Sequence, residues 1–164
     1  MRLITYQSAE GPRVGVLNGE RVRPVPGMDM LELIRQGEAG LARAAAATET
    51  ELALKSLTLL APIPQPRRNI VCLGMNYAAH AAESLRAKSL PIKMPEVPVF
   101  FTKATTTVNA PFGHIPFDPG VSAKLDWEVE LAVVIGKQGK NIARGDAFDY
   151  VFGYTVLNDI SARD

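Results

Sequence analysis

The sequence predicts a mixed α/β fold that is mainly β, with a small α+β domain in front of a larger, strand-rich one. Short segments in which apolar and polar residues alternate recur along the chain, and an alanine-rich stretch of helix formers lies between them. Three prolines fall between residues 62 and 66, where neither a helix nor a central strand would tolerate them. We therefore divide the chain into an N-terminal domain (1–61), a linker (62–69) and a main domain (70–164).

The composition excludes several classes of protein. The 164 residues are 47% hydrophobic and 21% charged, which is typical of one globular core, and the net charge of +1 gives no reason to expect nucleic acid or an anionic membrane as a partner. No apolar run approaches the roughly 20 residues that cross a bilayer. The single cysteine, Cys72, excludes an internal disulfide, and the start of the chain lacks a secretory signal. We predict a cytoplasmic protein whose partners are small molecules or other proteins.

The N-terminal domain opens with three segments that have the alternation of short strands: residues 2–7 (RLITYQ), 13–19 (RVGVLNG) and 21–25 (RVRPV). The dipeptide Asn18-Gly19 favours a two-residue hairpin turn between the second and the third. The chain is therefore expected to begin with an antiparallel sheet.

Two stretches are rich in helix formers. Residues 28–54 contain many alanines, leucines and glutamates, and Gly37 and Gly40 are expected to divide them into two helices. In the main domain, the apolar run at residues 70–73 predicts a buried strand, and residues 78–88 after it predict a second helical region.

The second helical region carries a candidate catalytic pair, His80 and Glu83. Residues three apart on a helix share one face and lie within reach of a hydrogen bond. A carboxylate in that position fixes the tautomer of the imidazole and raises its basicity, as a general base requires. The spacing alone fits an ordinary surface pair on an exposed helix equally well.

The segment LDWEVELAVVIGK (125–137) is predicted to be a buried strand that carries two carboxylates. The period of two places Glu128 and Glu130 on one face and the apolar residues on the other. Two like charges about 7 Å apart on a partly desolvated face repel each other unless a cation lies between them. The alternative is a polar strand face that water solvates.

A second carboxylate-bearing segment lies near the C-terminus of the sequence. The apolar run 151–157 predicts a strand, and Asn158 and Asp159 follow it. A carboxylate at the end of a strand commonly caps a turn, which is the structural alternative for Asp159. If Asp159 met Glu128 and Glu130, the three would form a set of hard oxygen ligands suited to Mg²⁺ or Mn²⁺.

Four segments resemble, in order and spacing, the signature blocks of the fumarylacetoacetate hydrolase family: GMNYAAHAAE (74–83), FFTKATTTV (100–108), LDWEVELAVVIGK (125–137) and GYTVLNDISARD (153–164). The resemblance spans residues 68–164 and points to the branch of acylpyruvate hydrolases and 2-hydroxyhepta-2,4-diene-1,7-dioate isomerases. It implies the β-roll of that family, incomplete here because members continue well past the last block, preceded by a small α+β domain.

The resemblance also implies a metal centre. In the family a pair of glutamates and an aspartate in these blocks hold a divalent metal, and these roles fall on Glu128, Glu130 and Asp159. The cofactor would be Mg²⁺ or Mn²⁺. Arg163 and Asp164 lie in the last block, and we expect them to support the turn at Asp159.

The implied reaction is divalent-metal-dependent hydrolysis of a C–C bond in a small 1,3-dioxo or 2-oxo acid, through an enolate that the metal stabilises. By resemblance, His80 and Glu83 would position and activate water, and Lys103 would lie near the substrate. An isomerase or decarboxylase of aromatic ring-cleavage products, or an oxaloacetate decarboxylase, is an open alternative because these reactions also pass through an enolate. A non-catalytic fragment that keeps the fold is a second alternative. The family commonly forms homodimers, so a homodimer is expected.

Overall fold

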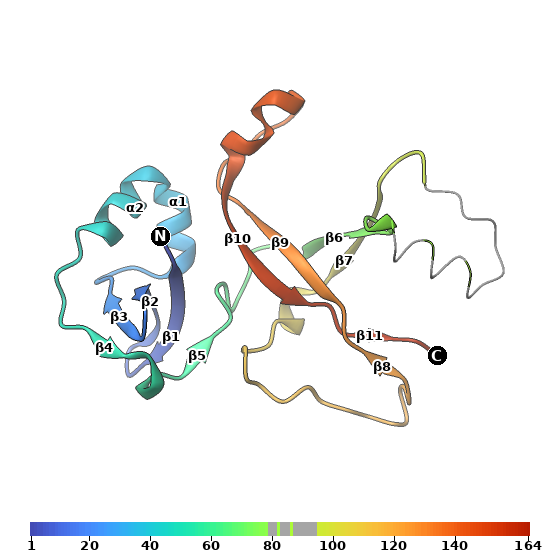
Figure 1. The fold of residues 1–164 in the computed structure, drawn as a ribbon, viewed down its shortest axis with the longest axis horizontal. Helices are drawn as coiled ribbons and strands as arrows, with labels where there is room; N and C mark the ends of the chain where they lie inside the picture. Colours follow the sequence, from blue (N-terminus) through green and yellow to red (C-terminus); the bar gives the residue numbers. More distant parts are fainter. Residues whose placement is uncertain (79–81, 83–85, 87–94) are drawn as a thin grey trace. The chain divides into compact units, whose positions relative to one another are not determined.

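The structure is a computed structural model that describes residues 1–78, 82, 86 and 95–164 (Figure 1). Its fold is mixed α/β and mainly β, as the sequence predicts. The chain forms two compact units: Met1–Pro64 together with Asn109–Asp164 make up the first, and Gln65–Val108 the second. No helix in the described residues is long and apolar enough to span a membrane.

The N-terminal part of the first unit contains a five-stranded antiparallel sheet in the order β4-β3-β2-β1-β5 (Figure 1). Its strands are β1 (Leu3–Ser8), β2 (Gly11–Asn18), β3 (Arg21–Pro24), β4 (Leu52–Ala53) and β5 (Leu59–Leu60). The three strands predicted at the start of the chain are therefore confirmed.

The turn between β2 and β3 lies one residue later than the sequence predicts. Asn18 pairs with Arg21, so Gly19 and Glu20 form the loop. Gly19 has a φ of 57°. Positive φ at the first central residue of a two-residue turn strongly favours glycine, and this choice leaves Asn18 inside the strand.

Two short helices, α1 (Met30–Gln36) and α2 (Glu38–Ala45), follow the sheet. Gly37, at a φ of 55°, divides them as predicted. The division expected at Gly40 is wrong, because Gly40 lies within α2 at a close contact: a Cβ there would stand 2.5 Å from the carbonyl oxygen of Leu33 in α1. The helical prediction also extends too far, since Leu52 and Ala53 pair with β3 instead.

The hydrophobic core of this part lies between the sheet and the two helices. Its buried members are Val14, Val25, Met28, Met30, Leu33 and Ala44. Burying such side chains contributes on the order of 1.5–3 kcal/mol each, which makes this cluster the main source of stability in the N-terminal part.

The cap of α1 provides a test of the local structure. The Asp29 carboxylate accepts a hydrogen bond from the Glu32 backbone N–H at 2.8 Å. We expect Asp29→Ala to lower the free energy of unfolding by about 1 kcal/mol, measured by urea denaturation, because an N–H of the first turn loses its partner. Asp29→Asn, which keeps an accepting oxygen, is the matched control and is expected to lose much less. Equal stability of the alanine variant and the original chain would contradict this role.

The C-terminal part of the first unit is a long hairpin followed by a short strand pair. β9 (Val129–Ile135) and β10 (Val151–Asn158) are antiparallel and are joined through the 3₁₀ helix η3 (Arg144–Tyr150), while β8 (Leu125–Asp126) pairs with β11 (Ser161–Ala162). The strand predicted over 125–137 is thus two strands, separated at Trp127 and Glu128.

The second unit contains one antiparallel pair, β6 (Ile70–Gly74) with β7 (Val99–Lys103). The strand predicted at residues 70–73 is therefore confirmed. The helix predicted over residues 78–88 lies largely outside the described residues. Two short 3₁₀ helices complete the described elements: η1 (Leu54–Ser56) and η2 (Thr105–Thr107).

The apolar face of β9 is exposed, which corrects the predicted burial. The alternation itself is present, because side chains along β9 change between exposed and half-buried at each residue. However, the apolar side chains are the exposed ones: Val129 is 73% and Leu131 62% exposed. Among the described residues the hairpin has no layer over this face, whereas the face that carries the glutamates is half-buried.

Candidate metal centre

The strand pairing brings the three predicted carboxylate residues to neighbouring positions. Glu130 in β9 is paired with Leu157 in β10, and two residues further the Asp159 N–H donates to the carbonyl oxygen of Glu128 at 2.8 Å. Directly opposite residues of an antiparallel pair project from the same face. Glu128 and Glu130 therefore share a strand face, and Asp159 lies across from Glu128.

These carboxylates are shielded from water to different degrees. Asp159 is 4% exposed and the Glu128 side chain 21%, while Glu130 is half-buried. A carboxylate removed from water is costly unless cations or hydrogen-bond donors compensate its charge. Such a site favours a bound cation.

The backbone at Glu128 is held on both sides of its own peptide unit. Its N–H donates to the side-chain oxygen Oδ1 of Asn158 at 3.2 Å, and its carbonyl oxygen accepts from Asp159. Asn158 had no predicted role, although it directly precedes Asp159 in the sequence. Its side chain fixes Glu128 at the point where β8 ends and β9 begins.

A cation does contact Glu128, and it belongs to the chain. The Nη2 atom of Arg163 lies in a short ion pair with Oε1 of Glu128. The same guanidinium donates from Nε and Nη2 to Oδ2 of Asp126 at 3.1 and 3.0 Å. The hydrogen bond to Asp126, with a further one to Glu128, raises the pKa of Arg163 above its ordinary value.

Asp164 secures the same segment from its other end. Its carboxylate accepts hydrogen bonds from the Ser122 hydroxyl, which is buried, and from the Ala123 N–H. These bonds, the Ser122 one first, lower the pKa of Asp164. Arg163 and Asp164 were expected to support the turn at Asp159; their side chains instead fasten the end of the chain to residues 122–128.

The donor set fits a divalent cation of the Mg²⁺ or Mn²⁺ type. Glu128, Glu130 and Asp159 are all carboxylates, and hard oxygen ligands are those that these ions prefer. Within the described residues, no three His, Cys, Asp or Glu side chains are grouped closely enough to hold a metal ion. The backbone therefore makes the three carboxylates neighbours, and their role as ligands stays a prediction.

The other predicted site residues stand apart from this geometry. His80 and Glu83 lie outside the described residues. Lys103 is the last residue of β7 in the second unit, where it pairs with Ile70. The catalytic roles of these three residues also stay predictions.

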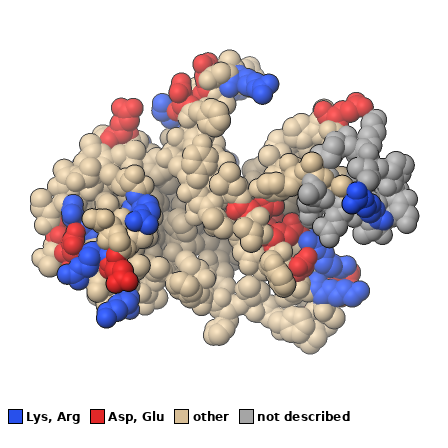
Figure 2. Space-filling view, in the orientation of Figure 1, with Lys and Arg blue, Asp and Glu red and all other residues tan. Residues whose placement is uncertain are grey.

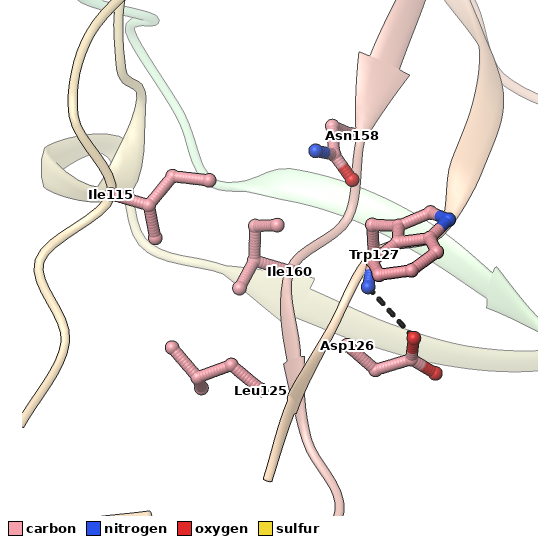
Figure 3. A pocket seen from close by; sticks show the side chains of 6 residues that line it. All are labelled: Ile115, Leu125, Asp126, Trp127, Asn158 and Ile160. Carbon is pink, nitrogen blue, oxygen red and sulfur yellow. Dashed lines mark hydrogen bonds between the residues drawn. The ribbon is translucent and has the colours of Figure 1, made fainter. Parts of the chain in front are cut away.

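An open pocket of about 440 Å³ adjoins the segment that carries Glu128 (Figure 3). Its lining is Ile115, Leu125, Asp126, Trp127, Asn158 and Ile160. The two polar members are also contacts of the carboxylate centre: Asp126 binds Arg163, and Asn158 binds the Glu128 N–H. Within the pocket, Asp126 accepts from the Trp127 N–H at 3.0 Å. A mostly apolar hollow thus borders a strongly acidic segment.

Family comparison agrees with the fold and with the ordered sequence blocks. Residues 69–164 match the family described as fumarylacetoacetate (FAA) hydrolase, C-terminal, and residues 1–62 match one described as Rv2993c-like, N-terminal. The chain therefore belongs to the fumarylacetoacetate hydrolase family.

Two relatives carry the same enzyme name. The chain is 40% identical to the mitochondrial oxaloacetate tautomerase FAHD2A of Bos taurus, covering 100% of this chain and 54% of that protein. It is 47% identical to the oxaloacetate tautomerase YisK of Bacillus subtilis over 68% of this chain and 36% of that protein. The chain spans about half the length of the first of these relatives.

Two solved structures are similar over essentially the whole chain. The maleylpyruvate hydrolase of Sphingobium sp. SYK-6, in complex with manganese(II) and pyruvate, has a TM-score of 0.73 at 30% identity, covering 99% of this chain and 60% of that one. A probable 2-hydroxyhepta-2,4-diene-1,7-dioate isomerase from Mycobacterium abscessus has a TM-score of 0.74 at 33% identity, covering 100% of this chain and 54% of that one. Members of the family thus carry tautomerase, hydrolase and isomerase names.

Proposed function

We propose that the whole protein is a divalent-metal enzyme that acts on a small 2-oxo acid through an enolate. The observation that carries this proposal is the hydrogen bond from the Asp159 N–H to the Glu128 carbonyl oxygen, which makes carboxylates from two strands neighbours. Mg²⁺ and Mn²⁺ both suit these ligands. The manganese in the similar maleylpyruvate hydrolase supports the use of such a cation here.

We place keto–enol tautomerisation of oxaloacetate first among the candidate reactions. Two relatives with 40% and 47% identity carry that name. Hydrolysis of a C–C bond in an acylpyruvate, the reaction implied by the sequence blocks, is the second candidate, and the name of the maleylpyruvate hydrolase supports it. Both reactions develop negative charge on an enolate oxygen, so the same carboxylate centre would serve either one.

Glu128, Glu130 and Asp159 would hold the cation, with the buried Asp159 the most shielded of the three. When bound, the cation would polarise the 2-oxo acid and stabilise negative charge on its oxygen. His80, oriented by Glu83, would accept a proton: from carbon in tautomerisation, from water in hydrolysis. Lys103 would bind the substrate carboxylate.

We further propose that the protein acts as a homodimer in the cytoplasm, without nucleic acid or membrane partners. On the face shown in Figure 2, acidic and basic side chains form small neighbouring groups separated by wide uncharged areas. Such a mixed surface gives no extended positive field for a polyanion. The exposed apolar residues of β9 offer a surface that a protein partner would cover.

The test uses the whole protein with Mg²⁺ or Mn²⁺ and follows two signals. We expect faster loss of the ultraviolet absorbance of enol-oxaloacetate, and we compare it with release of pyruvate from acylpyruvates. Removing the metal with EDTA should return either rate to that of buffer. A folded protein that binds Mn²⁺ and accelerates neither reaction would contradict enolate chemistry and favour the non-catalytic alternative.

A further inference from the structure

The most connected side chain near the predicted metal ligands is that of Arg163. It follows β11 directly, and its guanidinium contacts both Asp126 and Glu128, which are two residues apart. A planar guanidinium presents several N–H groups in a fixed fork, so it can hold two carboxylates at once. One side chain thereby ties the end of β8 to the predicted ligand Glu128.

The main chain holds Arg163 in the position that this bridge requires. Its N–H donates to the carbonyl oxygen of Lys124 at 2.9 Å, and β11 pairs with β8 through Ser161 and Asp126. The next residue, Asp164, is fastened to Ser122. The guanidinium therefore starts from a fixed backbone and reaches Glu128 from one direction.

This contact has a direct consequence for Glu128. The guanidinium binds the oxygen Oε1, so that the orientation of the carboxylate is set before any metal arrives. The Glu128 side chain is 21% exposed, which leaves it little water to reorient in. In metal sites, hydrogen bonds to the ligands fix their orientation and tune the affinity of the site.

We propose that Arg163 is a positioning residue of the metal centre: its guanidinium, shared between Asp126 and Glu128, holds the Glu128 carboxylate in its ligand orientation. The inference rests on the proposed function for the identity of the ligands. It extends that function to a residue that would contact neither metal nor substrate. Arg163 then acts on metal affinity through Glu128.

The test is a titration with Mn²⁺, followed by the paramagnetic signal of free metal, of the unchanged chain and of Arg163→Gln. Loss of the bridge is expected to weaken Mn²⁺ binding by roughly 10–100-fold. Arg163→Lys keeps the charge without the fork, so it should remain on the order of 10-fold weaker than the unchanged chain. Circular dichroism establishes that each variant is folded.

Two further variants separate positioning from simple support of the strands. Asp164→Asn weakens the fastening to Ser122 without touching Glu128, and we expect it to lower the melting temperature while leaving Mn²⁺ affinity within about threefold of the original. Asp126→Asn keeps Arg163 but weakens its second anchor, and should give an intermediate loss of affinity. This variant also keeps the proposal testable if Arg163→Gln does not fold.

The outcomes are distinguishable. Unchanged or tighter Mn²⁺ binding by Arg163→Gln would overturn the positioning role and leave the proposed function intact. An equal loss in Asp164→Asn would overturn it as well, because support of the strands would then account for the effect. If the unchanged chain binds no Mn²⁺, both this inference and the metal centre of the proposed function fail.

Discussion

Glu130→Gln is expected to weaken Mn²⁺ binding by more than roughly 100-fold, because it removes a charged ligand rather than a neighbour of one. Glu130 is half-buried on the face that it shares with Glu128, and its partner in β10 is Leu157. An amide keeps the shape of the side chain but loses the negative charge that attracts the cation. The measurement is the same titration of free Mn²⁺.

The matched control for this variant is Asp146→Asn. Asp146 is an exposed carboxylate in η3, at the opposite end of the β9–β10 hairpin, so it loses the same charge far from the proposed site. We expect its Mn²⁺ affinity to equal that of the unchanged chain. If Glu130→Gln and Asp146→Asn bind Mn²⁺ equally tightly, Glu130 is not a ligand. Equal weakening would point to the overall charge instead.

His80→Gln is expected to reduce kcat for acylpyruvate hydrolysis in the whole protein by roughly 10²–10⁴-fold, the usual contribution of a positioned general base. Glutamine has a similar reach but cannot take up a proton. The expectation comes from the HxxE spacing and the family blocks, since His80 lies outside the described residues. Mn²⁺ affinity should not change, because His80 is not among the proposed ligands.

The chain offers a natural control, since His114 is its other histidine. His114 is exposed in a loop, where its carbonyl oxygen accepts from the Asn109 amide, and His114→Gln should leave hydrolysis unchanged. Comparing His80→Gln with a His80→Gln, Glu83→Gln double variant then tests the pair: residues that act as one unit lose little more together than singly. Full hydrolysis by His80→Gln would contradict the water-activating role.

The sequence was sufficient for the elements whose signals are local. The first three strands, the helix break at Gly37 and the strands at residues 70–73 and 151–157 follow from apolar alternation and from glycine placement. The alternation along β9 was also correctly predicted, because successive side chains of a strand must point to opposite faces. The ordered blocks were enough to identify the family, which the comparison confirms.

Errors in the sequence-based fold arose where a distant contact overrode a local preference. Gly40 continues a helix because α2 packs closely on Leu33, and the helical signal beyond residue 50 gives way to pairing of β4 with β3. The burial of β9 was wrong for a similar reason. Alternation distinguishes two faces, but which face is covered depends on the layer that packs on it, and the described residues supply none for the apolar side.

The candidate site shows the same division between local and distant information. The sequence alone indicated that Glu128 and Glu130 share a strand face and need a cation. It did not indicate that Asp159 would hydrogen-bond to Glu128, or that Arg163 would bridge Asp126 and Glu128. These contacts join residues more than 30 positions apart and depend on the register of β9 with β10 and of β8 with β11. A shift of one residue would turn every side chain to the other face, so tertiary pairing decides which charges meet.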